Sequence, residues 1–153
     1  MRFGIKIIIF VLFLITITTY SYASGFTSFT GHKFNVNDSV WTADGSIANA
    51  GTLQTTTGRI NLDGNWANTG AFDAGTNGTV SFTGTGISTI TGANSFANFT
   101  CTQAGKTLKF EAGKTQTILE TWTVTGSTAG LISLRSTVDG TQWLVDPNKT
   151  RNI

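Results

Sequence analysis

Apolar residues recur along this chain in couplets separated by one position, and the couplets are set in Gly, Thr, Ser and Asn. A spacing of two places both side chains on one face of a β-strand. Successive couplets begin 20, 28 and 24 residues apart, which averages 24. A period of this length predicts a repeat architecture, in which each unit buries its apolar face only by stacking on the next. The four clearest couplets are Ile60 and Leu62, Val80 and Phe82, Leu108 and Phe110, and Ile132 and Leu134.

The composition predicts an all-β fold. Charged residues make up 12% of the chain, against about 25% in an average soluble domain. Gly, Thr, Ser and Asn disfavour helices relative to Ala, and residues 24–153 contain no apolar repeat at three and four positions. Gly-rich corners, where a positive φ is tolerated, separate the couplets at Gly75, Gly84, Gly92 and Gly113.

Two all-β architectures fit this pattern. The first is a right-handed parallel β-helix, also called a β-solenoid. The alternative is an antiparallel β-sandwich, which also shows short strands with turn signals every ~8–12 residues. The solenoid is favoured because the Asn-Gly hairpin signal occurs only at Asn77-Gly78.

The N-terminus has the three parts of an export signal. Arg2 and Lys6 form a basic head, residues 7–17 form an apolar stretch, and Ser21-Tyr22-Ala23 ends in the small residues that signal peptidase accepts. The apolar stretch is about half of the ~20 residues needed to cross a bilayer. We therefore predict a signal-peptide helix over residues 1–23, cleavage after Ala23, and an exported chain at the cell surface or outside the cell. The mature chain is not expected to span a membrane.

The remaining chain divides into residues 24–57, an N-terminal cap or first coil, and residues 58–153, the coils of the solenoid. The whole chain has 10 Lys and Arg against 8 Asp and Glu, so losing Arg2 and Lys6 with the signal leaves eight of each sign. Nucleic-acid binding needs a concentrated basic face. A balanced mature chain therefore argues against a nucleic-acid partner.

The side chains that usually perform catalysis are sparse. His32 is the only His and Cys101 the only Cys, so neither a Ser-His-Asp triad nor a zinc site has its usual complement. The carboxylates are scattered singly, without an Asp-x-Asp motif. We therefore predict no catalytic residues, no metal site and no cofactor, and expect that the protein is not an enzyme. Cys101 is expected to be buried in a strand.

Four tryptophans are the only candidate ligand-binding side chains. If they were exposed in a row, their rings could stack on sugar rings. The alternative is that they cover coil ends or fill the core, because each lies in or beside an apolar couplet. These residues are Trp41, Trp66, Trp122 and Trp143.

Part of the chain resembles a known family. The stretches from Gly78 to Gly92 and from Asn94 to Thr100, followed by Leu131–Ser136 and Gly140–Trp143, resemble segments of large exported bacterial surface proteins. Those proteins are right-handed parallel β-helices, similar to autotransporter passengers and haemagglutinin-type adhesins. The resemblance implies a non-catalytic, structural or adhesin-like protein, secreted or at the cell surface, whose partners would be surface glycans or other surface proteins.

The resemblance also implies that further coils follow residue 153, so that this chain is a truncated form. An uncapped last coil would leave an open strand edge that could pair with another chain in edge-to-edge self-association. A second functional hypothesis is a carbohydrate-binding module or a degenerate β-helix related to polysaccharide lyases.

The couplets predict which side chains face the core. Phe82→Asp and Phe110→Asp should prevent folding, because an unpaired buried charge costs several kcal/mol against a net stability of about 5–15 kcal/mol. Thr83→Asp, on the outward side, should be tolerated. Circular-dichroism melts of the three variants check this assignment, and equal tolerance at all three positions would contradict it.

Overall fold

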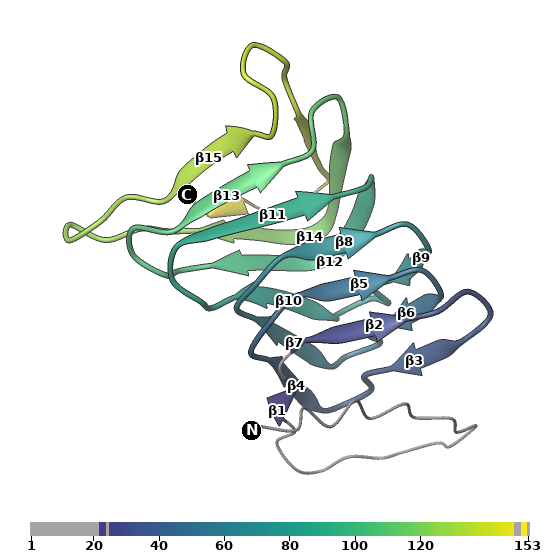
Figure 1. The fold of residues 1–153 in the computed structure, drawn as a ribbon. Helices are drawn as coiled ribbons and strands as arrows, with labels where there is room; N and C mark the ends of the chain where they lie inside the picture. The colour runs from purple at the N-terminus through teal and green to yellow at the C-terminus, as the bar shows by residue number, and fades with distance from the viewer. Residues whose placement is uncertain (1–21, 24, 149–150, 153) are drawn as a thin grey trace, which may run out of the picture.

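The computed structural model describes residues 22–23, 25–148 and 151–152, and this part of the chain is a parallel β-solenoid of about five turns. The purple N-terminal strands lie at one end and the yellow-green C-terminal strands at the other (Figure 1).

Three sheets, named A, B and C, form the sides of the solenoid. Sheet A contains β1 (Tyr22–Ala23), β4 (Val40–Ala43), β7 (Arg59–Leu62), β10 (Thr79–Phe82), β12 (Asn94–Cys101), β14 (Thr115–Val124) and β16 (Leu144–Pro147), and β17 (Arg151–Asn152) also pairs with β14. Sheet B contains β2 (Phe26–Ser28), β5 (Ile47–Asn49), β8 (Trp66–Asn68), β11 (Ile87–Thr91), β13 (Thr107–Phe110) and β15 (Ser133–Ser136), and sheet C contains β3 (Lys33–Asn35), β6 (Thr52–Gln54) and β9 (Ala71–Asp73).

Every strand pairing within the three sheets is parallel. The antiparallel sandwich is therefore wrong, and the parallel solenoid is confirmed. An antiparallel bridge joins Ser127 to Gly130, but it lies in a loop outside the sheets. Among the described residues there is no helix long and apolar enough to cross a lipid bilayer.

The predicted signal peptide lies outside the described residues except for Tyr22–Ala23. These two residues form β1 and pair with Thr42 and Ala43 of β4. Residues 25–57 contribute β2 to β6, with strands in all three sheets. The coils therefore begin before residue 58.

The coils lengthen along the chain: paired residues are 19 apart from β4 to β7 and 26 apart from β13 to β15. Asn49 and Asn68, which occupy equivalent corners of successive coils, are 19 residues apart. The couplets at Ile60 and Val80 stack in sheet A, whereas those at Leu108 and Ile132 belong to sheet B and the corner before it. The four couplets therefore do not mark one side of the solenoid, because the offset of 28 spans a whole coil and part of the next.

The core is a continuous column of apolar side chains. In sheet A one inward column runs through Trp41, Ile60, Val80, Phe99 and Trp122, which pair in register from strand to strand. All five are buried. Strands in a sheet lie ~4.8 Å apart, so each of these side chains packs on the residue one coil away.

The structure agrees with the predicted inward and outward positions of Phe82, Phe110 and Thr83. Phe82 and Phe110 are 1% and 0% exposed, whereas Thr83 is exposed. At the predicted corners, Gly75, Gly92 and Gly113 have positive φ. These glycines therefore occupy the left-handed region that few other residues adopt.

Sheet C merges with sheet A in the upper half of the solenoid. After β9 the chain turns through residues 74–78 before β10, but one coil later β12 runs from the third side into sheet A without interruption. A register shift between Phe96 and Asn98 bends this strand, as a β-bulge does. The rings of Phe72 and Phe96 lie 5.6 Å apart, which places the first part of β12 beside β9.

A buried ladder of polar side chains follows one corner of the solenoid. Asn49 Nδ2 donates to Asn68 Oδ1 at 2.8 Å, Asn68 Nδ2 to Asn94 Oδ1 at 3.0 Å, and Asn94 Nδ2 to Gln116 Oε1 at 2.8 Å. The hydroxyl of Ser28 donates to Asn49 Oδ1 and begins the ladder. Because an amide both donates and accepts, each residue bonds to the coil on either side. The ladder thus fixes the register of successive coils.

Removing one amide from the middle of this ladder should destabilise the fold. We expect Asn68→Ala to lower the free energy of unfolding by about 2–3 kcal/mol, since it breaks two buried hydrogen bonds and leaves an incomplete network. Asn61→Ala on the outer side of β7 is the matched control: Asn61 makes one 3.5 Å contact with Thr42 and should cost less than about 0.5 kcal/mol. Urea unfolding measures the free energy of unfolding of both variants. An equal decrease in the two would show that the ladder contributes no more to stability than the contact of Asn61.

Candidate functional site

Three carboxylates, those of Asp63, Asp73 and Glu111, bond to neighbouring coils. Asp63 Oδ1 accepts from Thr83 Oγ1 at 2.6 Å, and Asp73 Oδ2 accepts from Gln54 Nε2 at 2.7 Å. Glu111 Oε2 accepts the backbone N–H of Gly92 at 2.7 Å. The two members of each pair are 19 or 20 residues apart in sequence, which is one coil. These carboxylates therefore connect coils.

The structure does not gather potential metal ligands. Within residues 22–23, 25–148 and 151–152, no three His, Cys, Asp or Glu side chains lie close enough together to hold a metal ion. His32 is exposed between β2 and β3, with its ring centroid 6.5 Å from that of Phe29.

Three of the four tryptophans are in the core. Trp41, Trp66 and Trp122 are 7%, 0% and 4% exposed. Sugar stacking needs an open ring face, which these side chains do not have, so the structure does not support the predicted stacking site for them. Trp66 Nε1 donates to Asn94 Oδ1 at 2.9 Å and so joins the polar ladder.

Aromatic packing explains where the tryptophans lie. Trp122 stacks on Phe99 with ring centroids 4.6 Å apart and an interplanar angle of 14°. Trp143 is half-buried and stacks on Phe110 at 4.0 Å and 18°. The alternative from the sequence, that these rings fill the core and cover coil ends, agrees with this arrangement.

A lysine and a cysteine share the corner between sheets A and B. Cys101 is buried in β12, as expected, and Lys106 is buried just before β13. Lys106 Nζ donates to the carbonyl oxygen of Gly84 at 2.6 Å. Burial lowers the pKa of the Lys106 amine, and the charges of Cys101 and Asp63 partly oppose this shift. Burial raises the pKa of the Cys101 thiol, against smaller effects of a backbone hydrogen bond at Gln103 and the charge of Lys106.

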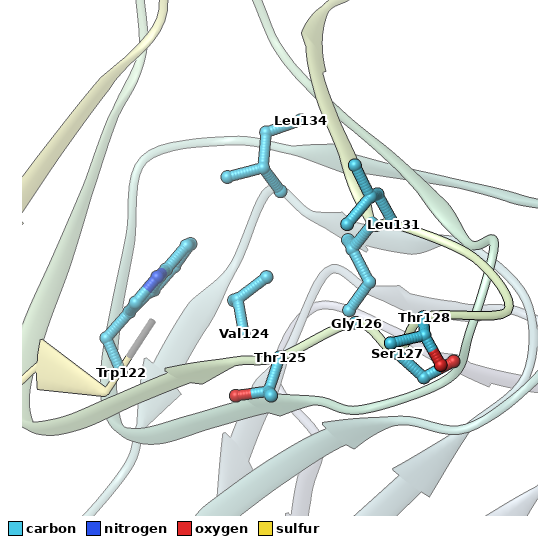
Figure 2. A pocket seen from close by; sticks show the side chains of 9 residues that line it. Trp122, Val124, Thr125, Gly126, Ser127, Thr128, Leu131 and Leu134 are labelled. Carbon is cyan, nitrogen blue, oxygen red and sulfur yellow. The ribbon is translucent and has the colours of Figure 1, made fainter.

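An apolar cavity of about 610 Å³ opens where β14 ends and β15 begins. Figure 2 shows the ring of Trp122 on one side, the side chain of Leu131 on the other, and the side chains of Val124 and Leu134 between them. The loop that carries Ser127 and Thr128 forms its polar rim. The lining residues are Trp122, Val124, Thr125, Gly126, Ser127, Thr128, Leu131, Ile132 and Leu134.

This cavity continues the core rather than interrupting it. Val124 follows Cys101 in one inward column, and Leu134 follows Leu108 in another. Cys101 and Leu108 are fully buried, whereas Val124 and Leu134 are only half-buried. The cavity is therefore the end of the apolar column within the described residues. It offers apolar contact and exposed strand edges.

Comparisons of the chain with protein-family models, curated proteins and solved structures found no match.

Sequence reasoning missed the ladder, the buried lysine and the open end. The ladder had a signal, because residues 43–51 and 62–70 repeat the pattern Asp-Gly, one residue, a large apolar residue, Ala-Asn, one residue, Gly at an offset of 19. Lys106 had none, since a Lys beside a Gly is typical of an exposed corner. The open end depends on which strands lack a neighbour, which only the topology shows.

The buried amine predicts a specific pH dependence of stability. The folded chain holds the pKa of Lys106 below its unfolded value of about 10.4. Protonation of the amine is therefore less favourable in the folded chain than in the unfolded chain. The free energy of unfolding is highest above about pH 10.4 for this group and decreases as pH falls through the folded pKa. The raised pKa of Cys101 acts with the opposite sign as pH rises above about 8.5. Variants that all keep Cys101 share this effect, apart from the part that the charge of Lys106 contributes to the pKa of Cys101.

We expect Lys106→Met to be as stable as the parent at pH 7 or up to about 2 kcal/mol more stable, because it removes a buried charge and keeps the volume. The gain should shrink between pH 7 and pH 10. Lys109→Met, on the other side of β13 and half-buried, is the matched control. Urea unfolding at both pH values gives the difference, and a gain at Lys106 that does not change with pH would contradict the prediction.

Proposed function

We propose that this chain is a non-catalytic, structural or adhesin-like β-solenoid that is exported to the cell surface or beyond. The observation that carries the proposal is how the reactive side chains are used. Asp63, Asp73 and Glu111 each accept a hydrogen bond from an adjacent coil, and Lys106 is buried on the carbonyl of Gly84. These three carboxylates and this amine, which an enzyme could present to a substrate, instead connect adjacent coils.

Two further features support this role. The first is the export signal predicted over residues 1–23. The second is the shape of the molecule: a stack of coils with a continuous core and a register fixed by the buried ladder. Repeat proteins of this kind present long regular surfaces, which suits a rod that projects from a cell. The resemblance to bacterial surface β-helices agrees with both features.

A second candidate, glycan binding, is favoured by the outer side of sheet A rather than by the tryptophans. There an uncharged column of hydroxyl and amide side chains follows the strands in register. Such groups both donate and accept hydrogen bonds, as sugar hydroxyls do. The column consists of Thr42, Asn61, Ser81, Thr100 and Thr123; Ser81 is buried and the other four are half-buried.

The location and the activity are tested together. We expect antibody labelling of intact cells to find the protein outside, and the intact mass to show that it begins at Ser24. The purified protein should not turn over polysaccharides. Turnover that is lost in Asp63→Asn, while folding is retained, would overturn the non-catalytic role.

A glycan array separates the two candidates. The structural role predicts no specific glycan. Specific binding that disappears in Thr100→Val and Thr123→Val would favour the glycan-binding candidate, because Val keeps the β-branched shape and removes only the hydroxyl. Thr89→Val, on sheet B, is the matched control.

A further inference from the structure

We propose that the C-terminal end of the solenoid binds the N-terminal end of a second copy of this chain, so that copies join head to tail. This inference deepens the structural role and rests on it. It concerns the two ends of the apolar column, which lie at opposite ends of the molecule (Figure 1).

Among the described residues, no further coil covers the C-terminal end. The cavity there is about 610 Å³, and its walls are half-buried apolar side chains whose equivalents one coil earlier are fully buried. Leu131 at the cavity rim is 82% exposed, and Leu144 of β16 is 52% exposed. A surface of this kind is typical of an interaction site.

The backbone at this end restricts what can bind. Among the described residues, β15 is the last strand of sheet B, and β17 pairs with Trp122 and Thr123 of β14. An edge strand presents unpaired N–H and C=O groups, which another strand satisfies best. The occupant should therefore be an extended chain that also brings apolar side chains to the cavity.

The N-terminal end has both an extended edge strand and apolar side chains. β2 and β3 are the edge strands of sheets B and C. Phe26 and Phe34 are half-buried there with ring centroids 4.7 Å apart, and Phe29 is 64% exposed. Asn35 of β3 has a buried Oδ1 atom with no hydrogen-bond donor among the described residues. This end thus offers aromatic side chains and edge strands to a second copy.

The side-chain columns match across such a junction. In sheet B the column that contains Phe26, Ile47, Trp66, Ile90 and Phe110 is apolar until its last member, Ser136. If β2 of a second copy paired with β15 in the same register, its Phe26 would lie over this small residue. The apolar column would then continue from one copy into the next.

Cleavage of the predicted signal and the balanced charge of the remaining chain both favour a second copy as the binding partner. β1 covers the edge of β4 and belongs to the predicted signal, so cleavage after Ala23 would leave β4 as an open edge of sheet A. Residues 24–153 carry eight cations and eight anions, so copies would not repel one another at long range. Because the two joined surfaces differ, the contact is heterologous and can extend into a filament.

Sedimentation of the processed chain over a range of concentrations tests the proposal. We expect the mass to grow beyond that of a dimer as concentration rises. Leu131→Lys should weaken association by about tenfold or more, since it places a charge in the cavity. Ile87→Lys is the matched control, because Ile87 is 60% exposed on β11, away from both ends. Both variants should melt at the parent's temperature.

A second variant blocks the other end. Phe26 N–H bonds to the Ser46 carbonyl, so the alternation along a strand points the N–H of Thr27 away from β5, and Thr27→Pro removes it. Mixing Thr27→Pro with Leu131→Lys should give only a heterodimer, because each variant keeps one intact end. A parent that stays monomeric, a dimer that does not grow, or association unchanged by Leu131→Lys would overturn the proposal. None of these outcomes involves substrate turnover, so they leave the structural role itself in place.

Discussion

Parallel pairing of each coil with the next, in register, is the constraint on which the rest of this structure depends. Once Ile60 is opposite Val80 and Val80 opposite Phe99, every inward position has the equivalent residue of the adjacent coil as its neighbour. The strand spacing of ~4.8 Å then brings these side chains into contact. The core is therefore built by repetition, and a change at one position acts on the coils above and below it.

The same geometry determines how polar residues are used. At the corner of sheet B it turns Asn49, Asn68 and Asn94 into a chain of amide hydrogen bonds. On the outside it places Asp63 beside Thr83 and Asp73 beside Gln54. Polar side chains that could support chemistry thus satisfy one another within the fold, and this is the basis for proposing a structural role.

Within the described residues, a stack built in this way has two ends that no further coil covers. The first coil leaves edge strands β2 and β3, and the last leaves β15 and an apolar cavity beside Trp122. Globular domains close their cores on all sides, but a solenoid needs a cap or a partner at each end. The proposed head-to-tail contact follows from this property, because the coil that fits best on such an end is another coil of the same path.

The sequence by itself determined the all-β class, the inward faces of Phe82, Phe110 and Cys101, and the Gly corners. These features are local: they depend on a period of two along a strand and on residues that tolerate a positive φ. The tertiary structure decided the coil length, the merging of sheets C and A, and the burial of Trp41, Trp66 and Lys106. It also showed where the core is open. Those features depend on which strands become neighbours across 19 or more residues, and a period measured from couplets on different sheets does not contain that information.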